Sequence, residues 1–288
     1  KYYSFDLRDY HSIVRLFKLF KIDEFYNLAS QSFVKESFEN PLITADITGL
    51  GVLRILDSLK TYQPKVKFYQ ASTSEMFGNT NEKYQNEQTK FKPRSPYGIS
   101  KLFAHELTNN YRVSYGIFAC SGILFNHESP LRGREFVTKK IVSDLVDVKF
   151  NKKKFMEIGN IYAKRDWGFA KDYVEAMWKM LQQKKPEDYV ICTGNSITVK
   201  DFINLILKKL NFKFKWVGKA LNEKAINLNN NREIIKINKE FFRPAEVDYL
   251  KGSYLKAKKN LNWKPNTKID QLVRIMVEGE IKIKNYYL

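Results

Sequence analysis

The chain has 288 residues, of which 43% are hydrophobic, and its 13 glycines and 8 prolines are too few for a fibrous or low-complexity protein. This length allows one large or two small domains with a sizeable core. Fifty Lys and Arg residues against 31 Asp and Glu residues give a net charge of +19. The basic residues are spread along the chain, which favours a solvated surface over a nucleic-acid-binding face.

Apolar runs alternate with amphipathic segments through the first 125 residues. The spacing predicts strands over residues 2–5, 24–28 and 66–72 and helices over residues 9–21 and 48–59. Thr73, Ser74 and Glu75 directly follow the strand that ends at residue 72. Because open α/β sheets bind their ligands at the carboxyl ends of strands, these side chains are candidates for a site.

A long helix is predicted over residues 96–113, with Ser95 as its N-cap and Pro96 at its first position. A buried strand over 117–125 follows, then a helix over 172–182, a strand over 189–193 and a helix over 199–210. The helix over 172–182 is expected to turn inward the side chains of Val174, Met177, Trp178 and Leu181. The polar remainder is expected to be irregular, with a loop over 227–232. The alternation predicts an α/β fold with a mainly parallel sheet.

Tyr97 and Lys101 stand four residues apart on the predicted helix and therefore share one face. A nearby ammonium favours the phenolate form of tyrosine, which can then act as a base in alcohol oxidation. Thr73 can hydrogen-bond the same alcohol, and Glu75 can move a proton on carbon. A tyrosine and a lysine at this spacing also occur on ordinary surface helices. The order of strand, Thr, Glu, capped helix, Tyr and Lys favours the functional interpretation.

At these residues the chain resembles the GDP-mannose 4,6-dehydratase family of the extended short-chain dehydrogenase/reductase superfamily. The resemblance runs nearly from end to end. It is carried by residues 68–75, 93–98, 122–130, 164–168, 171–178, 242–248 and 261–265.

The resemblance implies a Rossmann-like doubly wound parallel sheet, without its N-terminal strands, and a smaller mixed α/β substrate domain. Residues 1–125 and 161–195 are expected to form the dinucleotide-binding domain, and residues 126–160 and 196–288 the GDP-sugar-binding domain. The implied reaction converts GDP-mannose to GDP-4-keto-6-deoxy-mannose, with NADP as the bound cofactor.

The resemblance also implies roles for individual residues. Thr73, Glu75, Tyr97 and Lys101 are the expected catalytic residues. The expected cofactor-binding residues are Asp6, Leu7, Leu28, Ala29, Ser30, Gln31, Ser32, Lys101, His127 and Arg132. The expected substrate-binding residues are Ser74, Asn126, Lys140, Arg165, Arg243 and Glu246.

The sequence departs from the family in three ways. No glycine-rich phosphate-binding turn is found, and the chain begins at Lys1, so an N-terminal portion is expected to lie outside this sequence. Residues 28–32 lack the glycine that the family has beside the cofactor. Ile43 stands in place of a cofactor-contacting tyrosine, and Leu131 in place of an arginine.

Two other functions remain open from the sequence. A related sugar-nucleotide dehydratase or epimerase would share Tyr97 and Lys101, and the missing turn allows an inactive, truncated pseudoenzyme. The chain is expected to form a homo-oligomer, a dimer or tetramer, and to bind no nucleic acid, membrane or metal. Cys120 and Cys192 are expected to be reduced core thiols of a cytoplasmic protein.

Overall fold

The structure, a computed structural model, describes residues 1–242, 245 and 247–285. The chain divides into two compact units. The first unit consists of Lys1–Phe125, Tyr173–Cys192 and Gly252–Lys264, and the second of Asn126–Asp172, Thr193–Lys251 and Pro265–Leu288. Among the described residues, no helix combines the length and the apolar character needed to cross a membrane.

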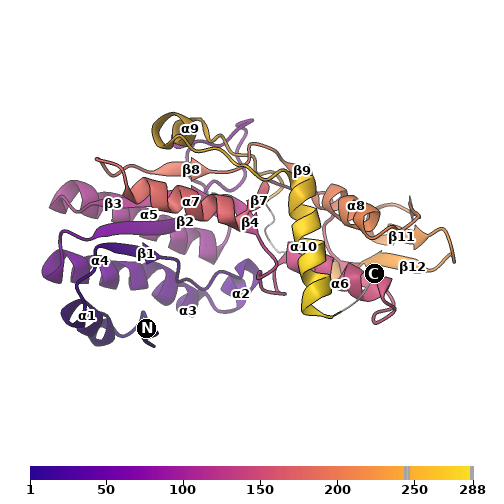
Figure 1. Ribbon diagram of the computed structural model, residues 1–288, viewed down its shortest axis with the longest axis horizontal. Coiled ribbons are helices and arrows are strands. Elements are labelled where there is room, and N and C mark those ends of the chain that lie inside the picture. The colour runs from indigo at the N-terminus through magenta and orange to yellow at the C-terminus, as the bar shows by residue number, and fades with distance from the viewer. Residues whose placement is uncertain (243–244, 246, 286–288) are drawn as a thin grey trace. The chain divides into compact units, whose positions relative to one another are not determined.

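A parallel sheet forms the centre of the first unit (Figure 1). Its strands lie in the order β1 (Glu24–Asn27), β2 (Lys67–Thr73), β3 (Ala119–Leu124) and β8 (Tyr189–Ile191). Each neighbouring pair is parallel, which requires a crossover connection between successive strands. Strand β2 is buried along nearly its whole length, so it has the continuous apolar character of a central strand.

Helices cover both faces of this sheet. One face packs against α1 (Tyr10–Leu19), α4 (Gly51–Tyr62) and α5 (Pro96–Tyr115). The other packs against α7 (Ala170–Leu181) and α9 (Leu255–Leu261). Phe68 belongs to the first core cluster and Tyr69 to the second, because successive strand residues point to opposite faces. Short helices α2 (Val34–Glu39) and α3 (Pro41–Ala45) and the π-helix Asp46–Leu50 connect β1 to α4.

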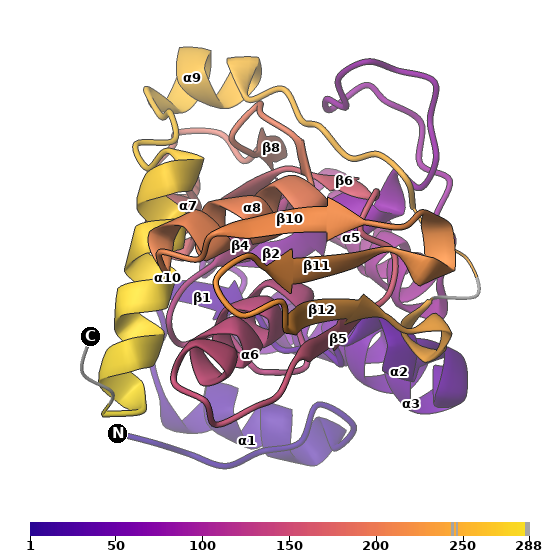
Figure 2. The ribbon, with the colours of Figure 1, turned by 90° about the vertical axis from the view of Figure 1, so that its right-hand side faces the viewer.

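The second unit contains a mixed sheet with the strand order β10 (Phe214–Val217), β11 (Lys224–Asn227), β12 (Glu233–Ile237) and β5 (Met156–Ile158). Figure 2 shows β10, β11 and β12 side by side. Strand β11 is antiparallel to both β10 and β12, and β5 runs parallel to β12. The core of this unit is formed with α6 (Val137–Lys149), α8 (Val199–Lys209) and α10 (Ile269–Ile283).

Smaller elements complete the described chain. Strand β4 (Asn126–Glu128) pairs with β7 (Trp167–Phe169), and β6 (Lys164–Arg165) pairs with β9 (Ile197–Thr198). Short 3₁₀ turns occur at Ser74–Met76, Ala220–Asn222 and Lys239–Phe241.

Several expected elements are corrected by the structure. Residues 2–5 form no strand, and none of the described strands pairs with them. On α7, Val174 and Trp178 are exposed, whereas Tyr173 and Ala176 are buried. The region after residue 210 contains β10, β11 and β12 rather than irregular chain, although residues 228–232 do form a loop between strands.

The compact units also differ from the expected domain boundaries. Residues 161–172 and 193–195 lie in the second unit, because β7 pairs with β4 and β6 with β9. Residues 252–264 lie in the first unit, because Ala257, Leu261 and Trp263 pack into its core. That the first unit binds the dinucleotide and the second the GDP-sugar stays a prediction.

Candidate active site

Thr73 ends β2 and caps the short 3₁₀ helix Ser74–Met76. Its Oγ1 accepts a hydrogen bond of 3.3 Å from the backbone N–H of Glu75. Thr73 and Ser74 are buried, and Glu75 is half-buried. The carboxyl end of a central strand therefore carries a hydroxyl and a carboxylate side by side in the chain.

Helix α5 begins with the predicted cap. Ser95 Oγ accepts a hydrogen bond of 3.0 Å from the backbone N–H of Gly98, and Pro96 occupies the first helical position. This start fixes Tyr97 in the first turn and places Lys101 one turn later. Both side chains are buried.

Gly98 allows the start of α5 to pack closely against the segment that carries Glu75. A Cβ atom at this position would lie 3.1 Å from the carbonyl oxygen of Glu75 and 3.0 Å from Cβ of Pro93. The first turn of α5 and the 3₁₀ helix after β2 are thus in direct contact. The structure brings together the elements that carry the predicted catalytic residues.

The Lys101 ammonium lies in an almost fully buried position. Its Nζ donates a hydrogen bond of 2.8 Å to the carbonyl oxygen of Ala71, and it lies 5.8 Å from the ring centroid of Tyr97. Burial lowers the pKa of Lys101 to about 8. When protonated, this group favours an anionic phenolate nearby, which suits Tyr97 to accept a proton from a hydroxyl.

Residues 28–32 follow β1 at the same edge of the sheet as Thr73. Leu28, Ala29 and Ser32 are exposed. The segment is tied to the π-helix through Thr48 Oγ1, which lies 3.1 Å from Ser30 Oγ and accepts a hydrogen bond of 3.2 Å from the backbone N–H of Gln31. The fixed backbone leaves an apolar surface at Leu28 and Ala29 open to contact.

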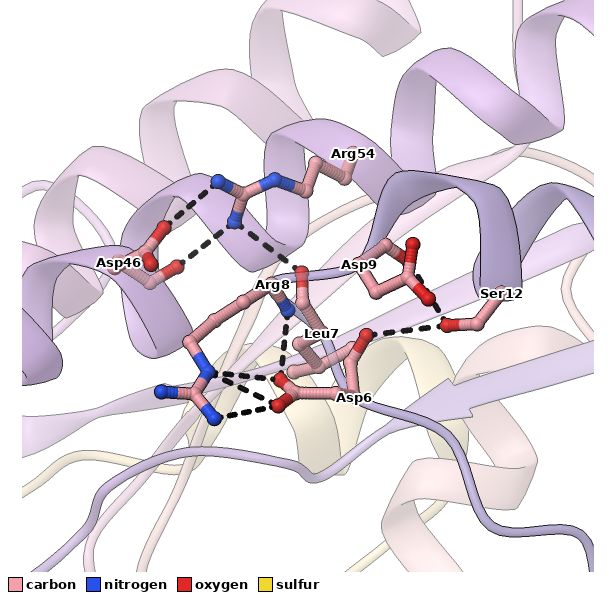
Figure 3. A network of polar contacts seen from close by, with 7 residues as sticks. All are labelled: Asp6, Leu7, Arg8, Asp9, Ser12, Asp46 and Arg54. Carbon is pink, nitrogen blue, oxygen red and sulfur yellow. Dashed lines mark hydrogen bonds and ion pairs between the residues drawn. The ribbon is translucent and has the colours of Figure 1, made fainter.

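Figure 3 shows the contacts around the predicted adenine-binding pair Asp6 and Leu7. The Asp6 carboxylate accepts hydrogen bonds from the Arg8 side chain, the shortest of 2.6 Å from Nη2, and one of 2.9 Å from the Arg8 backbone N–H. These bonds lower the pKa of Asp6 to about 2. The carbonyl of the buried Leu7 accepts a hydrogen bond of 3.2 Å from Arg54, which pairs with Asp46 at 2.7 Å. The pairing of Asp6 with Arg8 was not predicted from the sequence.

In the second unit, Asn126 and His127 lie on β4 and Arg132 follows in the next turn. The guanidinium carbon of Arg132 lies 3.5 Å from the ring centroid of Phe136, and its Nε lies 3.4 Å from Glu128 Oε2. Burial raises the pKa of Glu128 to about 7. Arg132 is therefore held by a flat aromatic ring and a buried carboxyl group.

Lys140 and Arg165 are also engaged within the second unit. Lys140 Nζ donates to the carbonyl of Glu157 and lies 4.2 Å from the ring centroid of Phe241. Arg165 is buried on β6, and its Nη1 donates a hydrogen bond of 3.0 Å to the carbonyl of Lys164. Arg243 and Glu246 lie outside the described residues. The predicted site residues thus fall into two groups, one in each unit.

Three buried polar residues beside the predicted catalytic group were not predicted as functional from the sequence. Asn27 and Gln70 lie on β1 and β2, and His105 on α5, where its Nδ1 is 3.0 Å from Ser72 Oγ. The sequence carries little signal for the first two, because β1 also contains Glu24 and β2 also contains Lys67, Ser72 and Thr73.

Comparison with known proteins agrees with this arrangement. The family model described as GDP-mannose 4,6 dehydratase matches residues 1–276. The GDP-mannose 4,6 dehydratase of Drosophila melanogaster is 44% identical over 280 residues, which are 96% of this chain and 71% of the relative. The human protein of the same name is 45% identical over 280 residues, 96% of this chain and 75% of the relative.

Among solved structures, RMD from Pseudomonas aeruginosa, determined in complex with NADPH, superposes with a TM-score of 0.83 at 22% sequence identity. The match covers 97% of this chain and 88% of that protein. At this identity it shows that the fold is shared. The family model over residues 1–276 and the relatives at 44% and 45% identity show that the chain belongs to the GDP-mannose 4,6-dehydratase family.

Proposed function

We propose that the chain is a lyase that converts GDP-mannose to GDP-4-keto-6-deoxy-mannose. The conversion consists of transient oxidation at C4 of the sugar, loss of water across C5 and C6, and reduction at C6. The observation that carries the proposal is the contact at Gly98, which joins the segment bearing Glu75 to the helix bearing Tyr97 and Lys101. Simple alcohol oxidation needs the tyrosine and lysine, whereas elimination also needs an acid/base group for carbon.

The residues of the first unit fit a nicotinamide cofactor. The exposed apolar surface at Leu28 and Ala29 suits a flat ring, and the buried ammonium of Lys101 suits a ribose hydroxyl. Asp6, Leu7, Ser30, Gln31 and Ser32 in this unit, with His127 and Arg132 of the second unit, complete the proposed set. When bound, such a cofactor would accept and return the hydride. We propose NADP as this cofactor; among proteins of the same fold, RMD was determined with NADPH, and a UDP-glucose 4-epimerase and a dTDP-glucose 4,6-dehydratase were determined with NAD.

Tyr97 is proposed as the base that removes the proton from the C4 hydroxyl, with Lys101 favouring its phenolate form. A ketone at C4 makes the C5 hydrogen acidic, and Glu75 takes that proton. The same carboxyl group then protonates the oxygen that leaves C6, assisted by the Thr73 hydroxyl. The proton removed from C5 leaves as part of the water. The hydride that returns to C6 leaves an enolate, which is protonated at C5 by the proton that Tyr97 took from the C4 hydroxyl, after that proton exchanges with solvent.

Binding of the GDP-sugar is assigned to Ser74 in the first unit and to residues of the second unit. Arg165 and Arg243 are proposed to pair with the diphosphate, since guanidinium groups match its geometry. Asn126, Lys140 and Glu246 are proposed to contact the remaining polar groups. Lys140 would have to exchange its bond to the Glu157 carbonyl for a substrate oxygen.

The test is turnover of GDP-mannose with NADP⁺ in deuterated water. We expect a 4-keto product that carries deuterium at C5. The Glu75→Gln variant should lose elimination by at least about 100-fold, as is typical for a general base, while slow C4 oxidation persists. Glu106→Gln, which changes an exposed carboxyl group on α5, is the matched control. Normal elimination by Glu75→Gln would refute the assigned role of Glu75.

Cofactor binding separates the proposed enzyme from an inactive relative. Calorimetry of the 288-residue chain with NADP⁺ should show binding if the described residues suffice to hold it. We further propose a homo-oligomer, a dimer or tetramer, located in the cytoplasm. Light scattering of the purified protein would determine its oligomeric state.

A further inference from the structure

Two buried amides lie next to the Lys101 site. Asn27 ends β1 directly opposite Gln70 on β2. Asn27 Nδ2 donates a hydrogen bond of 2.8 Å to Gln70 Oε1. Asn27 is 3% exposed and Gln70 is 0% exposed, so their polar atoms depend on protein partners.

The second bond of Gln70 reaches the acceptor that Lys101 also uses. Gln70 Nε2 donates a hydrogen bond of 3.1 Å to the carbonyl oxygen of Ala71, to which Lys101 Nζ donates at 2.8 Å. The pairing of β1 with β2 ends at Gln70, one residue before Ala71. One carbonyl oxygen beyond the end of that pairing therefore serves two side-chain donors.

The orientation of the Gln70 amide follows from its partners. A carbonyl can only accept, so the NH₂ group of Gln70 faces Ala71 and its oxygen faces the donor of Asn27. If the amide were reversed, its oxygen would face the carbonyl oxygen of Ala71 and this hydrogen bond would be lost. Asn27 thus decides whether Gln70 competes with the ammonium for this acceptor.

We propose that Gln70, oriented by Asn27, is a positioning residue that shares the Ala71 carbonyl with Lys101 and thereby limits how strongly this buried ammonium is held. Two donors on one oxygen share its lone pairs, so each bond is weaker than it would be alone. The arrangement keeps Lys101 in place while leaving its proton readily exchangeable. The catalytic role of this arrangement rests on the proposed function, whereas the hydrogen bonds themselves involve only residues of this chain.

Ionisable groups occur on α5 and on the elements packed against it. Helix α5 carries Tyr97, His105, Glu106, Tyr111, Arg112 and Tyr115, and the segment after β2 carries Glu75. The neighbouring strand positions carry Tyr69 and Cys120, and α2, the π-helix and α4 carry Lys35, Glu36, Glu39, Asp46, Arg54, Asp57 and Lys60. Burial alone nevertheless accounts for the lowered pKa of Lys101. An anion introduced at residue 70 would therefore act on an ammonium that has little other electrostatic support.

The test is NMR titration of the protein labelled with ¹³C and ¹⁵N in its lysine side chains, without substrate or cofactor. The Lys101 signal is identified by its loss in Lys101→Arg. Gln70→Glu keeps the bond to Asn27 and places a carboxyl group beside the ammonium. It should raise the midpoint of Lys101 by at least about one pH unit. Gln85→Glu changes an equally buried glutamine that bonds the Glu82 carbonyl, and should leave the midpoint unchanged.

Asn27→Asp is the second variant, because it removes the donor that orients Gln70 and should also raise the midpoint. In the unmodified protein, the Gln70 amide signal should move with pH at the Lys101 midpoint. The titration of the Gln70 amide signal uses the unmodified protein, so it tests the proposal even if the variants at residues 27 and 70 fail to fold. The proposal would be overturned if the Lys101 midpoint were unchanged in both variants. It would also be overturned if the chemical shift of the Gln70 amide did not change at the pH where Lys101 titrates. Unchanged turnover together with a shifted midpoint would instead count against the proposed function, because that function depends on Lys101.

Discussion

At the scale of single residues, Lys101 combines a functional role with a cost in stability. Its ammonium is almost completely buried, and burial lowers its pKa from 10.5 to about 8. The unfolded chain has no such burial, so there the lysine binds its proton at the ordinary pKa. The charged side chain therefore destabilises the folded protein at neutral pH.

Replacing this lysine should stabilise the fold while removing activity. Lys101→Met should raise the free energy of unfolding at pH 7 by on the order of 2 kcal/mol, less what the lost bond to the Ala71 carbonyl contributes. Below pH 8 the lysine is protonated in both the folded and the unfolded chain, so the variant has its full advantage in free energy of unfolding. Between pH 8 and 10.5 the unfolded state binds more protons, so the unmodified protein gains stability and the difference shrinks.

Denaturant unfolding between pH 6 and 10 measures this difference. Lys208→Met, which changes an exposed lysine of α8, is the control and should give a difference that does not vary with pH. If the advantage of Lys101→Met grew with pH instead, the lysine would not be a buried ammonium of lowered pKa.

The predicted catalytic residues and the amides beside them differ in how far the sequence could reveal them. Thr73, Glu75, Tyr97 and Lys101 follow from local order, since a capped helix after a strand fixes their neighbourhood. The link from Asn27 to Gln70 depends on the register between two strands that are 43 positions apart in the chain. Spacing within one segment carries no information about that register.

At the scale of elements, the approach of α5 to the 3₁₀ helix Ser74–Met76 sets the geometry of the proposed site. Gly98 is the position where the two come together, and an added Cβ would lie 3.1 Å from the Glu75 carbonyl oxygen. Backbone atoms cannot move aside as a flexible side chain can. A methyl group here must therefore push the segment bearing Glu75 away from the helix bearing Tyr97.

We expect Gly98→Ala to lower kcat by about 10- to 100-fold, because a displacement of a few tenths of an ångström already misaligns reacting groups. The matched control lies at the other end of the same helix. Gly116→Ala adds a methyl group with no neighbour within 4 Å, but at a backbone φ of +66°. It should cost about 1 kcal/mol of stability and leave kcat unchanged. Steady-state kinetics and thermal unfolding of both variants separate the two effects, and full activity in Gly98→Ala would refute the role of this contact.

The buried face of a helix could be predicted where its apolar residues form one stripe. It could not be predicted where they form two overlapping stripes. Helix α1 and the start of α5 agree closely with their sequence signals. On α7 the apolar residues form two overlapping stripes, and only packing selects the one through Tyr173, Ala176 and Met180 over the one through Val174 and Trp178. Strands β10 to β12 are four or five residues long and rich in lysine, so their alternation is weak.

At the scale of the whole molecule, the excess of positive charge affects the stability of the folded state. The net charge is +19, and a large net charge destabilises a compact state through self-repulsion. Dissolved salt screens such repulsion over about 10 Å at 0.1 M. Many lysines also form ion pairs in the structure, such as Lys139 with Glu280 at 2.5 Å, and these would be weakened by the same salt. Screening of the repulsion raises the stability of the fold, whereas screening of the ion pairs lowers it.

We expect repulsion to dominate, so the unfolding temperature should rise by a few degrees between about 20 and 300 mM NaCl. Lys184→Glu combined with Lys185→Glu tests the cause, because both lysines are exposed after α7. Each substitution changes the charge by two, so the pair lowers it from +19 to +15. The double variant should unfold at a higher temperature in low salt and respond less to added salt. Scanning calorimetry measures both quantities. A temperature that falls with salt in the unmodified protein would show that its ion pairs outweigh its net charge.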